Sequence, residues 1–259
     1  MTTPHTPDDD LITSDPGTSD ADSRRGIPRW ITWSIVAVVA IVAVGYGLIL
    51  LYAKVHNDTP DEFGESDLDA ALASPPTVTV TRPAAPSGGE AWTVARESEL
   101  GYRVKEILFG VDTEGVGRTN EITGSMTIDG TTVTTAEFTV DVASITSDDG
   151  RRDNQFRGRI MTTSEFPTAT FVLTEPIELG VEPADGAEVT TSATGELTLR
   201  GVTNTVTFDL TARQEGDRIG VLGDIPIVFA DYAIANPSNP GVTTEDHGLL
   251  EFVLVFEPA

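Results

Sequence analysis

The chain has 259 residues, which is enough for one or two ordinary domains. It carries 41 acidic residues against 16 basic ones, a formal net charge of −25. Nucleic acid is therefore not expected as a partner, because binding phosphates requires a basic face. The absence of cysteine excludes disulfides, thiolate nucleophiles, Cys-ligated zinc and lipid anchors built on cysteine.

Residues 1–29 form a polar segment that shows no apolar periodicity and includes the acidic run Asp8, Asp9 and Asp10. Such a composition cannot bury enough apolar surface to fold alone. We predict a disordered cytoplasmic tail.

Residues 30–53 are predicted to form a single transmembrane helix. The stretch from Ile31 to Ala53 contains no charged residue and is long enough, as a helix, to cross a hydrocarbon core of about 30 Å. Three arginines precede it and one lysine follows it: Arg24, Arg25, Arg29 and Lys54. This asymmetry favours a cytoplasmic N-terminus and an extracytoplasmic C-terminal domain, in a single-pass protein of the cell membrane.

The alternative for this segment is a cleaved signal peptide. Its apolar stretch is longer than a usual signal core of about 7–15 residues. The sequence Leu51-Tyr52-Ala53 is also a poor match to a small-x-small cleavage site. We therefore expect an uncleaved anchor.

Residues 54–89 are predicted to be a linker that holds the next domain away from the bilayer. The segment is acidic in its first half and rich in proline and glycine in its second. That composition is typical of an extended spacer. A helical turn over 67–73 is compatible with the sequence but not required by it.

From Glu90 to the end, residues 90–259, alternation of apolar and polar residues dominates. Examples are Tyr102-x-Val104, Ile122-x-Gly124-x-Met126-x-Ile128, Ala136-x-Phe138-x-Val140-x-Val142, Val206-x-Phe208-x-Leu210 and Phe252-x-Leu254-x-Phe256. Turn signals such as Asp129-Gly130 and Glu215-Gly216 separate them. We predict a mainly β domain, an antiparallel barrel of eight strands, with an open sandwich as the alternative.

One segment of this domain breaks the β pattern. Residues 147–161 open with acidic and capping residues and then place Arg152, Phe156 and Ile160 at intervals of four. This spacing predicts a short helix with one apolar edge, packed against an end of the barrel.

Several motifs in this domain occur together in a recognisable order. They are Trp92-Thr-Val94, Val140-Asp-Val-Ala-Ser-Ile145, Arg152-Asp153-Asn154, Phe166-Pro167-Thr-Ala-Thr-Phe171, and Gly195-Glu-Leu197-Thr198-Leu199-Arg200-Gly201-Val202-Thr203-Asn-Thr-Val206. Over about Glu90 to Phe256 the chain resembles the YceI-like family of lipid-binding domains. That family commonly has an early histidine, where this sequence reads Glu97-Ser98-Glu99-Leu100.

The resemblance implies a lipocalin-like barrel that holds an isoprenoid or a similar long-chain lipid in its interior. Each ligand methylene removed from water contributes about 0.8 kcal/mol, so a long chain binds without polar contacts. The residues expected to contact such a ligand are Tyr102, Met126, Phe138, Val140, Arg152, Phe156, Phe166, Phe171, Gly195, Leu197, Phe208 and Phe229. The alternative is that these side chains pack as an ordinary core with no space between them.

Four arginines lie in the helical segment of this acidic domain: Arg151, Arg152, Arg157 and Arg159. One interpretation is an anion site at the mouth of the barrel, for a phosphate or lipid head. The other is a solvated helix face paired with neighbouring aspartates, which we expect for all of them except Arg152.

Enzymatic activity is not expected. Within the domain only His247 could complete a Ser-His-Asp arrangement, and it lies in an apparent turn, Glu245-Asp246-His247-Gly248. One histidine without cysteine forms no zinc or similar metal set, although a calcium site made of carboxylates alone stays open. We expect no cofactor.

Two functions from different classes are consistent with these observations. The first is a membrane-tethered module that binds an isoprenoid or similar lipid for storage or transfer. The second is an envelope interaction or stress protein with a solid barrel core and no small-molecule ligand. The sequence does not predict an oligomeric state.

Overall fold

The computed structural model describes residues 29–55, 59–74, 89–180 and 186–259. The predicted tail, apart from Arg29, lies outside the described residues, as do 56–58 and 75–88 of the predicted linker. α1 spans Arg29–Val55, and its segment Trp30–Leu51 is long and apolar enough to cross a membrane, with no side chain buried. The predicted apolar helix is confirmed; a signal sequence would have the same features.

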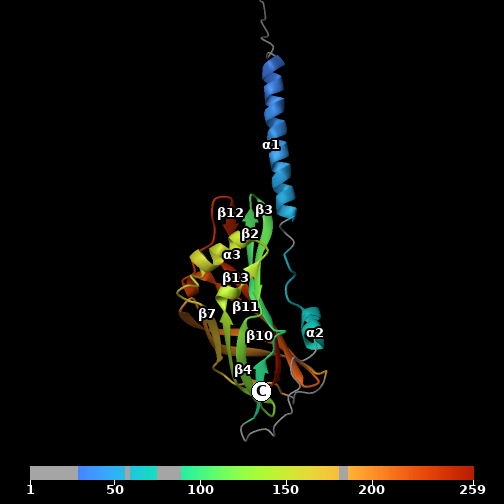
Figure 1. The fold of residues 1–259 in the computed structure, drawn as a ribbon, viewed down its shortest axis with the longest axis vertical. Helices are drawn as coiled ribbons and strands as arrows, with labels where there is room; N and C mark the ends of the chain where they lie inside the picture. Colours follow the sequence, from blue (N-terminus) through green and yellow to red (C-terminus); the bar gives the residue numbers. More distant parts are fainter. Residues whose placement is uncertain (1–28, 56–58, 75–88, 181–185) are drawn as a thin grey trace, which may run out of the picture. The chain divides into compact units, whose positions relative to one another are not determined.

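The rest of the described chain is mostly β-structure (Figure 1). The first strands are β1 Glu90–Val94, β2 Glu99–Leu108, β3 Val111–Thr119, β4 Ile122–Asp129, β5 Thr132–Asp141, β6 Thr146–Ser147 and β7 Thr168–Leu173. The later strands are β8 Ile177–Glu178, β9 Glu188–Leu199, β10 Val202–Glu215, β11 Arg218–Val228, β12 Val242–Thr244 and β13 His247–Pro258. Two short 3₁₀ turns accompany them, η1 Val142–Ser144 and η3 Phe229–Tyr232.

Eight of these strands close into an antiparallel barrel, as predicted. Their order is β1-β4-β5-β7-β9-β10-β11-β13, and β13 returns to β1 through the pairs Trp92↔Pro258 and Val94↔Phe256. β13 is long enough to pair with β2 as well, and β2 continues the sheet through β3 to β6. Closure removes free sheet edges from the barrel wall, which a sandwich would have left exposed.

The turn between β1 and β2 is hydrogen-bonded to β13, which pairs with both of these strands. The Ala95 N–H donates to the Val255 carbonyl at 2.7 Å, and the Val255 N–H donates to Ser98 Oγ at 2.9 Å. Ser98 is almost completely buried, so its hydroxyl replaces one backbone partner in the ladder.

The predicted short helix is confirmed. α3 spans Gly150–Gln155 and continues as one π-helical turn, η2, over Phe156–Ile160. Asp149 caps α3 by accepting the Arg151 N–H at 2.8 Å. α3 lies at the end of the barrel that also carries β12 and the β2–β3 connection; we call this the α3 end, and β4 and the C-terminus lie toward the opposite end (Figure 1).

Part of the predicted linker folds onto the barrel. Residues 59–74, which we call the strap, contain α2, Glu65–Ala73, and pack on the outward faces of β11 and β13. Leu68 is fully buried, and a Cβ at Gly220 would lie 2.5 Å from its Cδ1. The outward side chains Val253 and Val255 complete this cluster. The composition of the linker did not reveal this contact, because its apolar partners lie far away in sequence.

Buried charges fasten the beginning of the strap. Arg103 and Glu251 are both 3% exposed and pair at 3.1 Å, while Arg118 also reaches Glu251, at 3.0 Å. The two arginines then donate to strap carbonyls, those of Pro60 at 2.8 Å and Asp61 at 2.5 Å. Further along, Arg218 donates to carbonyls at the end of α2 and pairs with Glu97. The strap is thus bonded to the barrel at both of its ends.

Candidate functional site

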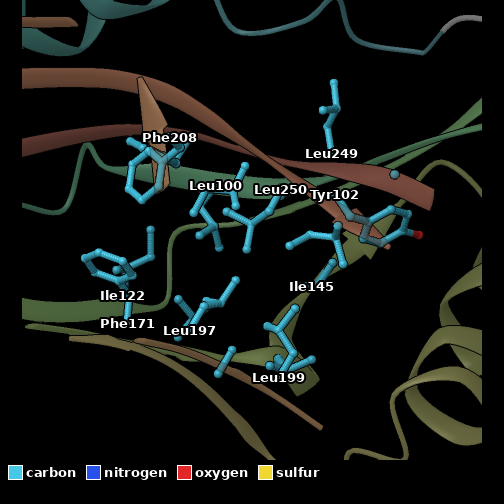
Figure 2. Close-up of a pocket in the computed structure, with 18 of the residues that line it drawn as sticks. Leu100, Tyr102, Ile122, Ile145, Phe171, Leu197, Leu199, Phe208, Leu249 and Leu250 are labelled. Carbon is cyan, nitrogen blue, oxygen red and sulfur yellow. The ribbon is translucent and has the colours of Figure 1, made fainter. Parts of the chain in front are cut away.

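A cavity of about 690 Å³ runs through the inside of the barrel. Residues of seven of the eight barrel strands, all except β1, line it together with residues of β2, α3 and η2. Figure 2 shows part of the wall, with Leu100 and Leu250 on one side and Leu197 and Leu199 on the other. The volume lies within the range of about 300–1,000 Å³ that is usual for small-molecule sites.

Large inward side chains surround this space without filling it. Five phenylalanine rings contact one another in sequence around the interior, with centroids 5.6–6.2 Å apart: Phe256, Phe138, Phe171, Phe208 and Phe252. Phe138 and Phe171 are nevertheless only partly buried, although both point inward. Their remaining exposure is toward the cavity, so the interior is not a closely packed core.

Gly195 was expected among the ligand contacts, but it is not among the residues that line the cavity. A Cβ at this position would lie 2.4 Å from Cζ of Phe171 and 2.6 Å from the Val172 carbonyl oxygen. The space left by the missing side chain is therefore occupied by the phenylalanine ring of the paired strand β7.

Tyr102 and Phe156 meet at the α3 end of the cavity. Their rings stack with centroids 4.8 Å apart, and the tyrosine ring lies against Gly117, where a Cβ would come within 2.5 Å of Cε1. Burial raises the pKa of Tyr102 well above its usual range, and the positive charge of Arg152 opposes this only in part. The phenol is therefore neutral at physiological pH and available as a hydrogen-bond donor.

Arg152 lies beside Tyr102 and is already paired. Its guanidinium contacts Asp148 and lies 3.3 Å from Glu106 Oε1. Burial alone would lower the pKa of Arg152, but the two carboxylates outweigh it and raise the pKa. A ligand anion would have to compete with both of them.

The other arginines of this segment also bond within the protein. Arg157 donates to the Ile145 carbonyl at 3.2 Å, Arg159 to the Pro237 carbonyl at 2.9 Å, and Arg151 pairs with Asp149 at 3.2 Å. Pairing with neighbouring aspartates was expected for these three arginines and not for Arg152. Of the three, Arg151 has such a partner, whereas Arg157 and Arg159 bond to backbone carbonyls instead. Arg152, the expected exception, is the one that contacts Asp148.

The structure brings most of the predicted ligand contacts to one cavity. Ten of them line it: Tyr102, Met126, Phe138, Val140, Arg152, Phe156, Phe171, Leu197, Phe208 and Phe229. Phe166 is outside the lining, because it precedes β7 and its ring packs against Gly201 instead. The role of these residues in holding a ligand stays a prediction.

Other lining residues were missed by sequence reasoning. They include Leu100, Val104, Ile145, Leu173, Leu210 and Leu250. Most of them continue an alternation already recognised; Leu250, for example, extends the series Phe252-x-Leu254-x-Phe256 by two positions. Ile145 follows η1 and had no periodic signal.

His247 lies away from the cavity, on an exposed part of β13. Its Nδ1 is 2.9 Å from Asp246 Oδ1 and its Nε2 is 3.3 Å from Glu245 Oε2. The hydrogen bond with Asp246 raises the pKa of His247. Among the described residues no group of three or more His, Asp or Glu side chains could hold a metal ion.

A sequence model of the YceI-like domain matches residues 92–256, which is more than half of the chain. The chain belongs to the YceI-like family. A UPF0312 protein of Pseudomonas aeruginosa is 32% identical over 133 residues, which cover 48% of this chain and 65% of the relative. A UPF0312 protein of Shewanella sp. (strain MR-4) is 31% identical over 134 residues, 48% of this chain and 66% of the relative.

A solved structure shares the YceI-like fold. It is a polyisoprenoid binding domain from Saccharophagus degradans implicated in plant cell wall breakdown. The TM-score is 0.54 at 19% sequence identity, and the alignment covers 66% of this chain and 99% of that domain. At this identity the likeness concerns the fold alone.

Proposed function

We propose that the domain binds one long apolar molecule, an isoprenoid or a similar lipid chain, inside the barrel. The observation that carries the proposal is the cavity of about 690 Å³, bounded through its middle by aliphatic and phenylalanine side chains. The Tyr102 hydroxyl and the Arg152 guanidinium lie at the α3 end, where the polar head of such a molecule would be placed. The polyisoprenoid binding of the Saccharophagus degradans domain supports the same ligand class.

The proposal includes the tether. α1 would remain in the cell membrane and hold the barrel on the outer side, storing or transferring lipid at the bilayer that supplies it. The arginines before the span and the single lysine after it support this orientation. A solid-core interaction protein is not favoured, because the barrel interior contains unfilled space.

Narrowing the cavity tests the binding proposal. Leu250 lines the cavity and is partly buried, so Leu250→Trp would project an indole into it. The matched control is Val172→Trp on β7, whose side chain is 45% exposed and points outward. We expect native mass spectrometry of the detergent-purified full chain to show a long-chain lipid adduct for the wild type and the control, reduced at least tenfold in Leu250→Trp. Equal adducts in both variants, with unchanged circular dichroism, would rule out the cavity as the site.

The absence of cysteine gives a direct test of the orientation. A single cysteine placed at the exposed Val228 should react with a membrane-impermeant maleimide in intact cells. A cysteine at Thr3, in the predicted cytoplasmic tail, should react only after lysis. Labelling of Thr3→Cys in intact cells, or protection of Val228→Cys, would refute the proposed topology.

A further inference from the structure

Exposed apolar side chains occur at the tip of the β2–β3 hairpin, at the α3 end of the barrel. Phe109 is 57% exposed and Ile107 is 45% exposed. In the described barrel only Val172 and Val228 are comparably exposed among large apolar residues, and they lie on different strands. The hairpin tip is therefore an apolar surface in an otherwise acidic protein.

The backbone conformation at the hairpin tip is unfavourable for a phenylalanine. Phe109 and Gly110 have φ of +49° and +85°, the signs of a two-residue turn that favours Asn-Gly. A residue with a Cβ costs energy in the left-handed region, and the ring of Phe109 stays largely in solvent.

The tip is firmly held and adjoins the cavity. The Phe109 N–H donates to the Gly241 carbonyl at 2.8 Å, and its ring covers Gly241, where a Cβ would lie 2.5 Å from Cε1. Phe109, Leu108 and Val242 belong to the lining of the cavity. The exposed apolar surface is thus the rim of the site proposed to hold lipid.

The strap restricts which end of the barrel can meet a membrane. Leu51, the last residue of the apolar span, and Pro60 are nine positions apart, and α1 continues to Val55. The four steps from Leu51 to Val55 are helical and add about 1.5 Å each, and five further steps reach Pro60. Even if these five steps were fully extended, Leu51 and Pro60 would be at most about 23 Å apart. Arg103 donates a hydrogen bond to the Pro60 carbonyl, so the chain between Leu51 and Pro60 limits how far the barrel can lie from the end of the apolar span.

The distance from Arg103 to each end of the barrel can be estimated by counting residues along the strands and compared with this maximum separation. Arg103 is five positions from Leu108, or about 17 Å along β2, on the side of the hairpin tip. In the other direction its partner Leu249 is nine positions from Pro258, about 30 Å along β13. Strand tilt shortens both distances in the same proportion. The α3 end lies within reach of the bilayer, whereas the opposite end lies at or beyond the limit.

We propose that the β2–β3 hairpin tip, Ile107 and Phe109, docks on the lipid surface of the membrane that carries α1, so that the cavity rim meets the bilayer. This inference rests on the proposed tether and goes beyond it. The charges next to the tip are mixed: Lys105 pairs across the hairpin with Glu114, Ile107 with Asp112, and the Glu245 N–H donates to the Lys105 carbonyl. The contact is therefore apolar rather than electrostatic, and a zwitterionic surface suffices.

Single-cysteine labelling of the full chain in phosphatidylcholine nanodiscs tests this docking. An environment-sensitive fluorophore is attached at Ile107→Cys and, as matched control, at Val172→Cys, which has the same 45% exposure but lies on β7 across the barrel. A third probe at Val42→Cys reports on the span. We expect the probe at position 107 to be quenched at least threefold more by nitroxide-labelled lipid, and threefold less by aqueous iodide, than the probe at position 172, in low and high salt alike.

The outcomes separate the two proposals. Strong quenching at position 42 with equal quenching at 107 and 172 would overturn the docking and leave the tether intact. No quenching at position 42 would overturn the tether and the docking together. Loss of quenching at position 107 in 0.5 M salt would overturn an apolar contact. As a further check, Phe109→Asp should remove the shielding at position 107 without altering the circular dichroism spectrum.

Discussion

The two faces of β13 have different packing. Its inward side chains line the cavity, and one of them, Leu250, is only partly buried there. Its outward side chains Val253 and Val255 are covered by the strap and are 2% and 0% exposed. One strand therefore borders both a cavity and a closely packed structural contact. The comparison indicates that the outer face is packed without the unfilled space that the inner face borders.

The largest expected effect follows from breaking the buried charge cluster on the outer face, which consists of Glu251, Arg103 and Arg118. Glu251→Gln leaves Arg103 and Arg118 without their shared carboxylate in a buried position, which costs about 3 kcal/mol of unfolding free energy. Chemical denaturation of the full chain in detergent measures this. The control Glu196→Gln, on the exposed side of β9, should change stability by less than about 0.5 kcal/mol. Similar losses in both variants would mean that the cluster does not hold the strap.

A matched pair of leucines sharpens the comparison. Leu68→Ala removes a fully buried side chain from a packed contact and should cost about 3 kcal/mol. Leu250→Ala removes a side chain that already borders a cavity, so it loses little packing and should cost about 1 kcal/mol. Equal costs by the same denaturation assay would contradict the difference in packing between the faces.

The smallest expected effect concerns the helix on the cavity side. The Arg151 backbone N–H and guanidinium lower the pKa of the Asp149 carboxyl. The stabilisation of α3 by this cap is present above the ordinary carboxyl pKa of about 3.9 and is lost as pH falls through the lower folded-state value. Asp149→Ala should cost about 1 kcal/mol. The protection factors of the α3 amides, which are corrected for the intrinsic pH dependence of exchange, should fall as the cap is protonated in the wild type. They should be low at all pH values in the variant, while the protection of α2 stays unaffected by the mutation.

The sequence predicted the barrel because alternation, a local property, determines which side chains face inward. It also predicted the helix over residues 147–161, from the spacing of Arg152, Phe156 and Ile160. The strap was missed, although a signal existed: residues 249–256, LLEFVLVF, are apolar at nearly every position, which indicates a strand covered on both faces. Leu68 and Leu72, four apart, supply the cover.

The cavity itself could be predicted only in part. Its lining followed from alternation, but its volume depends on how rings from different strands meet. Gly195 illustrates the limit: the space beside it is taken by Phe171, and only the pairing of β7 with β9 reveals this. Phe166 was expected at the site because its motif includes it, yet the turn before β7 directs its ring elsewhere.

The connection from β6 to β7, which carries α3 and η2, has a consequence for how the proposed lipid would enter and leave. β3 pairs with the short β6 and β4 pairs with β5, while α3 and η2 cover the space between. In the described chain, the backbone hydrogen bonds found for α3 and η2 are local, such as Met161 N–H to the Phe156 carbonyl, and their contacts with the barrel are made by side chains. An outward movement of this segment would leave every strand ladder intact, so a long molecule could be exchanged on the timescale of a loop motion without any melting of the sheet.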